Sequence, residues 1–273
     1  MELVVFDLDG TLLDARAQVS EHTQETLRRL RQRHIAYTVA TGRTLHASRD
    51  LLANHGFDLP HIYKNGVVIW QPSTDAYSHS NLLSAHEIEE ILGAFIAAEV
   101  TPFVFTLGPD NHQVVYHTPL LTDAERRLVK VFGEDRGLTL ADLTDMALHA
   151  EVTNISALGN REPLGHIEHA VAAQPHLVAY GGAAFEGEHL YWLDIHHSAA
   201  SKGGAVERLR EDLAIERVIC FGDSDNDLSM FSVADESYAP SNAKESVKAA
   251  ATAVIGHHDA DGISHFLRER FNL

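Results

Sequence analysis

Apolar and polar residues near the start of the chain follow two different periods. Residues 2–7 contain the apolar run Leu3 to Phe6, and Ile35–Ala40 is a second, mostly apolar stretch, as is typical of buried strands in a parallel sheet. Between them, residues 20–33 place apolar side chains at helical spacing and open on Ser20, a residue that caps helices well. The order strand, helix, strand predicts a βαβ unit at the amino end of the chain.

The middle of the chain has a different rhythm. Helical spacing recurs at residues 84–99, 122–136 and 161–173, and short strand-like runs alternate with these helices. The strand-like runs are 102–107, 113–117, 151–158, 177–180 and 189–195. This alternation predicts a separate α+β module with an antiparallel sheet.

The α/β pattern returns after residue 195. We expect a helix from Lys202 to Leu213, a buried strand from Arg217 to Phe221 and a helix after Asn226. One domain is therefore expected to be interrupted by another. The predicted fold class is α/β, with a Rossmann-like core whose sheet is mostly parallel and an inserted α+β cap domain. The expected domains are residues 1–81 and 196–273 for the core, and 82–195 for the cap.

Charge and composition narrow the partners. The 273 residues carry a formal charge of -18, which repels a polyanion, so we expect no nucleic-acid partner. A phosphorylated metabolite would be repelled too, unless its site holds a metal ion or a well-placed Lys or Arg. The single cysteine, Cys220, excludes an internal disulfide and agrees with a cytoplasmic location. No stretch of 18 apolar residues occurs, so we expect no membrane span.

The first candidate site follows the first predicted strand, in Asp7-Leu8-Asp9-Gly10-Thr11. Ligands of open α/β sheets bind beyond the carboxyl ends of the strands, where these two carboxylates stand. Alternate residues of a strand share a face, so Asp7 and Asp9 are expected to converge, and Gly10 lets the backbone approach an anion closely. The alternative is an ordinary solvated Asp-Gly turn.

Three further segments follow predicted strands or open helices. Thr41 follows the second strand, Lys202 opens a helix, and an acidic run containing Asp223 and Asp227 follows the strand that ends at Phe221. Each has a plain alternative, as a helix cap, a surface lysine or an acidic loop. Together with the first segment, they supply a nucleophile, a hydroxyl donor, a cation and hard oxygen ligands, which phosphoryl transfer requires.

On these segments the chain resembles the haloacid dehalogenase (HAD) superfamily, in the branch of Cof-type sugar phosphatases. The resemblance spans nearly the whole chain and rests on several ordered segments. These are Asp7 to Thr11, Thr41-Gly42-Arg43, Asn65-Gly66, Ser201-Lys202-Gly203, Gly222 to Asp227, and Ser241-Asn242-Ala243. It implies a mobile cap over the active site.

The resemblance also implies residue roles. Asp7 would be the nucleophile that forms an aspartyl-phosphate, and Asp9 the general acid and then base. Mg²⁺ would be held by Asp7, the backbone carbonyl of Asp9 and Asp223, with Asp227 either a ligand or a neighbour of the ligands. Thr41, Lys202 and Asn226 would bind phosphate.

For two residues, both a functional and a structural role remain open. Arg43 either contacts substrate or braces the crevice, and Asn65 either contacts substrate or simply forms a turn with Gly66. Asp225 is left out of the site, because the resemblance does not require an acid there.

These observations predict a Mg²⁺-dependent phosphatase that hydrolyses small phosphomonoesters, such as sugar phosphates or phosphorylated cofactors. A phosphosugar mutase with the same nucleophile is one alternative, and a non-catalytic phosphate-sensing protein is another. The substrate itself is not predicted. A monomer or weak homodimer is expected, because the chain is long enough to bury its own core.

Overall fold

The computed structural model of the chain describes residues 2–108, 112–135, 138–184 and 189–273. The chain divides into two compact units, one made of Met1–His79 with Ala200–Leu273 and the other of Ser80–Ala199. They are called the core unit and the inserted unit below. The sequence places the insertion at residues 82–195.

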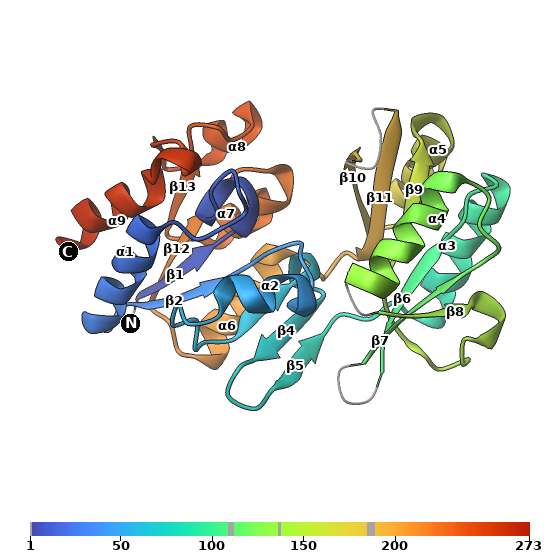
Figure 1. Cartoon of the computed structure of the whole chain (residues 1–273), viewed down its shortest axis with the longest axis horizontal. Helices are drawn as coiled ribbons and strands as arrows, with labels where there is room; N and C mark the ends of the chain where they lie inside the picture. The colour runs from blue at the N-terminus through green and yellow to red at the C-terminus, as the bar shows by residue number, and fades with distance from the viewer. Residues whose placement is uncertain (1, 109–111, 136–137, 185–188) are drawn as a thin grey trace. The chain divides into compact units, whose positions relative to one another are not determined.

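The core unit is built on a parallel sheet of five strands in the order β14-β13-β12-β1-β2 (Figure 1). Strands β1 and β12 are neighbours although they are distant in sequence, with Phe6 opposite Phe221. Their carboxyl ends therefore lie at the same edge of the sheet. The strands are β1 (Glu2–Phe6), β2 (Ala36–Val39), β12 (Arg217–Phe221), β13 (Glu236–Pro240) and β14 (Ala253–Ile255).

Helices cover both faces of this sheet. Val4 and Phe6 of β1 pack in a cluster with apolar residues of α1 and α9, whereas Leu3 and Val5 pack with those of α6, α7 and α8. Both faces of the strand are thus buried, which explains its continuous apolar sequence. The helices are α1 (Glu21–Gln32), α6 (Lys202–Asp212), α7 (Leu228–Val233), α8 (Glu245–Ala250) and α9 (Gly262–Phe271).

A small antiparallel sheet completes the core unit. The helix α2 (Leu45–Leu52) leads to β3 (His61–Tyr63), which pairs antiparallel with β4 (Val68–Gln71). β5 (Ala76–Ser80) extends this sheet. Asn65-Gly66 lies in the tight connection between β3 and β4, whose Tyr63 and Val68 are paired.

The inserted unit holds a six-stranded sheet in the order β10-β11-β9-β6-β7-β8. Apolar residues of α3 and α5 pack on one face, and those of α4 pack on the other. The sheet is antiparallel from β10 to β7, as expected, and mixed only because β8 pairs parallel with β7. Its elements are α3 (Ala85–Ala97), β6 (Phe103–Leu107), β7 (Gln113–His117), α4 (Asp123–Lys130), β8 (Thr139–Asp142), β9 (Glu151–Asn160), α5 (Arg161–Ala172), β10 (Leu177–Ala183) and β11 (Leu190–His197).

Most expected helices and strands are present, with four omissions. The structure adds β5, β8, α8 and α9, none of which the sequence pattern predicted. The helix expected over 122–136 is regular only as α4 and continues as a wider turn through Val131–Asp135, while residue 136 lies outside the described residues. Among helices of the described residues, none combines the length and hydropathy that crossing a bilayer requires.

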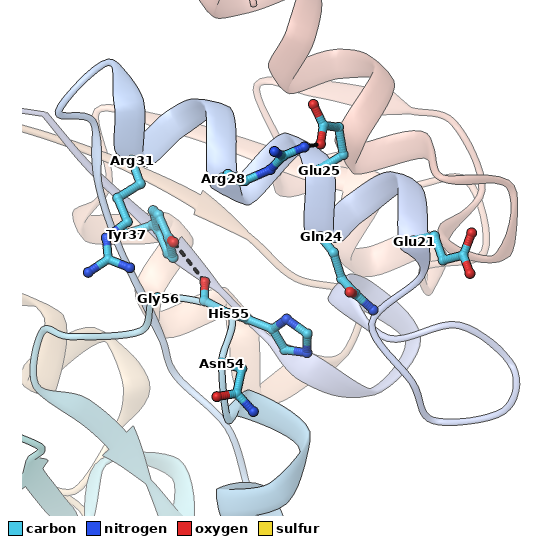
Figure 2. Close-up of a pocket in the computed structure, with 9 residues that line it drawn as sticks. All are labelled: Glu21, Gln24, Glu25, Arg28, Arg31, Tyr37, Asn54, His55 and Gly56. Atoms are coloured by element: carbon cyan, nitrogen blue, oxygen red, sulfur yellow. Dashed lines mark hydrogen bonds and ion pairs between the residues drawn. The ribbon is translucent and has the colours of Figure 1, made fainter.

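A cavity of about 370 Å³ lies beside α1 in the core unit (Figure 2). Arg28 and Arg31 of α1 line it together with Tyr37, whose hydroxyl donates to the carbonyl of His55 at 2.8 Å. None of the residues predicted to carry chemistry lines this cavity.

Candidate active site

The carboxyl ends of β1 and β12 bring two aspartates together. The backbone N–H of Asp7 continues the pairing of these strands by donating to the carbonyl of Phe221 at 2.9 Å, and Asp223 follows β12 by two residues. The intervening turn Leu8–Leu12 passes so close that a Cβ on Gly10 would lie 2.6 Å from Oδ2 of Asp223. Gly10 also has φ of +72°, so only glycine fits the turn without strain.

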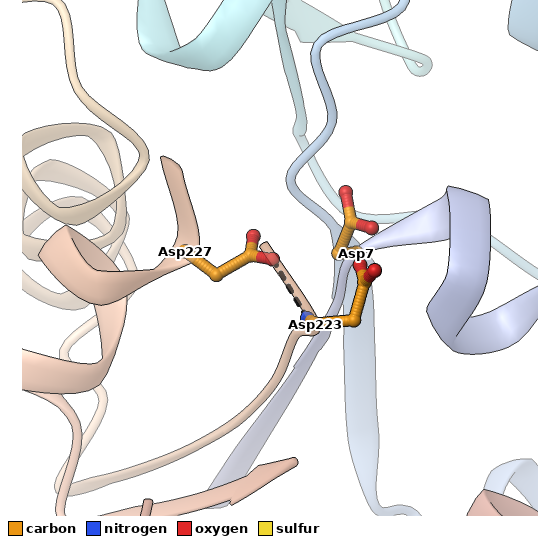
Figure 3. A group of neighbouring side chains, drawn as sticks. All are labelled: Asp7, Asp223 and Asp227. Atoms are coloured by element: carbon orange, nitrogen blue, oxygen red, sulfur yellow. Dashed lines mark hydrogen bonds between the residues drawn. The ribbon is translucent and has the colours of Figure 1, made fainter. Parts of the chain in front are cut away.

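A third aspartate completes an acidic cluster (Figure 3). Carboxylate oxygens of Asp7, Asp223 and Asp227 all lie within 4.8 Å of one another. Asp227 is fully buried, and its Oδ2 accepts from the backbone N–H groups of Asp223 and Ser224 at 2.8 and 2.9 Å. This turn therefore fixes Asp227 before α7 begins.

Lys202 lies inside this cluster. Its Nζ donates to Oδ1 of Asp7 and to Oδ1 of Asp227, both at 2.6 Å, and its side chain is 0% exposed. Lys202 is the first residue of α6, which Ser201 caps by accepting from the N–H of Gly204. The surface-lysine alternative is therefore wrong.

The charges of this cluster do not balance. Three carboxylates meet one ammonium group, and burial raises the pKa of Asp7 to about 8, with repulsion from Asp227 and Asp223 adding to the effect of burial. Burial and Asp227 likewise raise the pKa of Asp223. Burial alone would lower the pKa of Lys202, but the attraction of Asp227 and Asp7 outweighs it and raises that pKa. A hard divalent cation fits this excess of buried carboxylate oxygens.

Asp9 does not join the acidic cluster, contrary to the expectation that it converges with Asp7. Its carboxylate instead accepts two hydrogen bonds from the guanidinium of Arg43, at 2.6 and 2.5 Å. The reason is local: Asp9 lies past the end of β1, in the turn Leu8–Leu12, so the alternation of strand side chains no longer applies. Its side chain is 58% exposed, which leaves it accessible to a ligand.

Thr41 and Arg43 follow β2, the strand that pairs with β1. Thr41 is buried, and its hydroxyl oxygen accepts from the backbone N–H of Arg43 at 3.1 Å. Arg43 is held further by donating from Nη1 to the carbonyl of Ala47 in α2. Arg43 is thus tied to its own loop and to Asp9, which brings two of the predicted residues into contact.

Asn65 and Asn226 also meet. Nδ2 of Asn226 donates to Oδ1 of Asn65 at 2.9 Å. Lys64 and Asn65 both have positive φ, and a Cβ on the next residue, Gly66, would clash with the carbonyl oxygen of Ser201. This left-handed turn therefore fits tightly against the residue that precedes Lys202, and strain of this kind is common at functional sites.

Two supporting residues escaped the sequence interpretation. Thr11 is buried and donates to Oδ1 of Asp223 at 3.2 Å, and Asn242 donates to the carbonyl of Gly10 at 2.8 Å. Both lie in segments on which the family resemblance rests, so the resemblance was the signal that could have identified them. Asp225, left out of the site, pairs at the surface with Lys244 at 2.7 Å.

A mostly parallel α/β core with a buried acidic cluster at its strand ends fits the class of metal-assisted hydrolases. The sequence pattern of the haloacid dehalogenase-like hydrolase family matches residues 4–267, and the chain belongs to that family.

Relatives of the chain are named as phosphatases, which agrees with this family. A 5-amino-6-(5-phospho-D-ribitylamino)uracil phosphatase of Bacillus subtilis is 26% identical, covering 99% of this chain and 98% of the relative. An HMP-PP phosphatase of Cronobacter sakazakii is 29% identical, covering 97% and 94%. The solved structure of a haloacid dehalogenase-like hydrolase from B. subtilis superposes with a TM-score of 0.76 at 26% identity, covering 98% and 99%. The chain is accordingly a phosphomonoester hydrolase.

Proposed function

We propose that this hydrolase uses Mg²⁺ and a covalent aspartyl-phosphate on Asp7 to hydrolyse small phosphomonoesters. The observation that carries the proposal is the buried cluster in which Lys202 joins Asp7 to Asp227 beside Asp223. Asp7 and Asp223 would hold the cation with the backbone carbonyl of Asp9. Bound there, Mg²⁺ would supply positive charge beside the incoming phosphate.

Asp7 acts as the nucleophile in this proposal. Its Oδ1 is bound by Lys202, so Oδ2 is the oxygen presented for attack on phosphorus. The new bond from Oδ2 to phosphorus forms as the bond from phosphorus to the alcohol oxygen breaks. Lys202 and the hydroxyl of Thr41 bind phosphate oxygens, and Asn226, placed by Asn65, orients them.

Asp9 transfers the protons. In the first step its carboxyl group gives a proton to the departing alcohol oxygen. In the second step Asp9 takes a proton from water as the water oxygen attacks phosphorus and the bond to Asp7 breaks. Phosphate leaves and Asp9 is protonated again, so atoms and charges balance over the cycle.

Asp227 is assigned a supporting role. Three protein donors already bind its carboxylate, namely Lys202 and the backbone N–H groups of Asp223 and Ser224. For Asp7, the described side-chain donor is Lys202 alone. Asp227 therefore has less capacity left for a cation, and we assign it to holding Lys202 and Asp223 in place.

The substrate is proposed as a phosphorylated small metabolite, in line with relatives that are named as phosphatases of such compounds. A cytoplasmic location, the absence of a nucleic-acid partner and a monomeric or weakly dimeric state remain predictions.

Replacement of Asp7 tests the mechanism. Asp7→Asn keeps the shape of the side chain but removes the nucleophile, so Mg²⁺-dependent hydrolysis of p-nitrophenyl phosphate should fall by about 10⁴-fold or more. Asp225→Asn changes an aspartate in the neighbouring loop that pairs at the surface, and it should retain full activity. An active Asp7→Asn enzyme would rule out the aspartyl-phosphate.

A further inference from the structure

A second cavity lies in the core unit, next to the one shown in Figure 2, and shares Arg31, Asn54 and Gly56 with it. Its volume is about 520 Å³, and its lining includes none of the proposed catalytic or phosphate-binding residues. We call it the α2 cavity, because Leu45, Arg49 and Leu52 of α2 form one wall. A volume of this size suits a small molecule.

Four aromatic rings also line the α2 cavity. Phe57, His61, Tyr63 and Trp70 line the cavity, and each is less than 7% exposed. His61 contacts Phe57 and Tyr63 edge to face, with interplanar angles of 87° and 85°. Its two ring nitrogens already bond the carbonyl of Phe57 and the hydroxyl of Tyr63. Tyr63 is 0% exposed, so the accessible part of this lining comes from the rings of Phe57, His61 and Trp70.

The rim of the α2 cavity carries charges of both signs. Arg31 pairs with Asp58 at 2.8 Å, and Arg49 pairs with Asp75 at 3.5 Å. All four side chains are more than 60% exposed, and ion pairs exposed to this degree are weak. A guanidinium has five N–H donors, so each arginine retains donors for another carboxylate. The rim thus suits a ligand that carries both an anion and a cation.

We propose that the α2 cavity binds an aromatic zwitterion of the class of the aromatic amino acids. The ring would pack against Phe57 and Trp70, the carboxylate would accept from Arg31 or Arg49, and the ammonium group would donate to Asp58. A purely anionic ligand would be repelled by the rim aspartates, and a purely cationic one by the arginines. An aliphatic amino acid would lose the contacts between rings.

The α2 cavity adjoins two segments of the candidate active site. α2 follows Arg43 closely in sequence, and Nη1 of Arg43 donates to the carbonyl of Ala47 in that helix at 3.2 Å. On the other side, Tyr63 ends β3 and is followed after one residue by Asn65, which accepts from Asn226. A ligand that displaces α2 or β3 is therefore expected to change turnover, an effect that rests on the proposed function.

Trp70 provides a direct test of binding. The chain has two tryptophans, Trp70 and Trp192, so a Trp192→Phe variant reports on Trp70 alone. Titration with L-phenylalanine, followed at a wavelength that phenylalanine does not absorb, should give a saturable change in fluorescence. Adding Arg31→Gln and Arg49→Gln should weaken the apparent affinity about tenfold, equivalent to loss of a charge-assisted hydrogen bond.

Arg208→Gln is the matched control, because Arg208 also forms an exposed pair with an aspartate, Asp212, at 3.1 Å but lies on α6 away from the cavity lining. It should leave the titration unchanged. Absence of a saturable change, or equal weakening by Arg208→Gln, would overturn the site.

Three analogues of the probe test the assigned chemistry. Phenylacetate lacks the ammonium group, phenethylamine lacks the carboxylate and L-leucine lacks the ring, so each should bind more weakly than L-phenylalanine. An analogue that binds as tightly would overturn the assignment of a zwitterion. These measurements need no turnover, so they stand apart from the proposed function.

The link to catalysis needs an active enzyme. L-phenylalanine should change kcat/KM for p-nitrophenyl phosphate, with a half-maximal concentration about tenfold higher in the Arg31→Gln, Arg49→Gln variant than in the wild type. Unchanged kcat/KM alongside measurable binding would overturn the regulatory link.

Discussion

The core unit and the inserted unit bury acidic side chains in opposite ways. In the inserted unit, the buried carboxylates of Glu87 and Glu125 accept hydrogen bonds from capping groups at the starts of α3 and α4, and Glu87 also lies 3.6 Å from Nε2 of His197 in the same unit. In the core unit, the pairs Lys202–Asp7 and Thr11–Asp223 join residues 195 and 212 positions apart. Buried carboxylates thus serve helix starts in one unit and a tertiary site in the other.

This difference has a physical basis. A capping carboxylate receives backbone N–H donors that every helix start leaves unsatisfied, so its environment is supplied by its own helix. The aspartates of the core unit follow separate parallel strands and meet only when the sheet forms. A buried carboxylate that caps its own helix therefore stabilises the fold. Buried carboxylates that come together from distant segments repel one another, and a cation can relieve that repulsion.

The largest effect is expected from Lys202→Met. This change leaves Asp7 and Asp227 buried without their cation, so the free energy of unfolding should fall by about 3–5 kcal/mol. Phosphatase activity should also be lost, since the ammonium group that binds phosphate is gone. Urea unfolding and p-nitrophenyl phosphate hydrolysis measure the two effects.

The control is Lys244→Met, which removes a similar pair, with Asp225 at 2.7 Å, from the surface of the same unit. Exposed pairs contribute little, so the loss should stay below about 1 kcal/mol. Similar losses in the two variants would show that burial is not what distinguishes Lys202.

The sequence was sufficient for those parts of the site that depend on strand ends. Asp7, Thr41 and Asp223 follow apolar runs, and parallel pairing of β1 with β2 and β12 brings those run ends together. The contact of Asp9 with Arg43 was not predictable, because it depends on the path of two turns. The fully buried position of Lys202 also depends on tertiary packing, to which a one-dimensional pattern gives no access.

The elements that the sequence missed lack local signals. Asp261, the N-cap residue of α9, has a left-handed φ of 55°, and its side chain makes no capping hydrogen bond. The start of this helix therefore lacks the capping pattern by which a helix is predicted from sequence. β8 is a partly exposed strand at one edge of its sheet and shows no alternation of buried and exposed residues.

Glu236 is a buried acid of the core unit that pairs over a long range but lies away from the candidate active site. It begins β13, at the opposite end of the strand from the candidate site, and accepts hydrogen bonds from Arg217, Arg270 and Tyr238. Hydrogen bonding by Arg270, together with that of Tyr238, lowers the pKa of Glu236 from 4.5 to about 2. Glu236→Gln should therefore reduce the free energy of unfolding at neutral pH by about 2–3 kcal/mol while leaving turnover unchanged.

The pH dependence of that loss has a definite sign. A carboxyl whose pKa is lowered by folding stabilises the protein fully above its unfolded pKa of 4.5, and the contribution disappears as the pH falls toward about 2. The gap in stability between wild type and Glu236→Gln should thus narrow below pH 4.5. A gap that is constant over this range would mean that lost packing, rather than lost charge, accounts for the difference.

The smallest effect is expected from Ser84→Ala at the start of α3. Ser84 accepts from the N–H of Glu87 at 3.3 Å and donates to its carboxylate at 2.6 Å, so the change removes one cap and weakens its partner. The cost should be about 1 kcal/mol, seen as faster hydrogen exchange in the first turn of α3. Exchange in β1 and β12 and turnover of p-nitrophenyl phosphate should not change, because Ser84, Glu87 and His197, the further partner of Glu87, all lie in the inserted unit. Faster exchange in those core strands would show that buried acids of the inserted unit are not local after all.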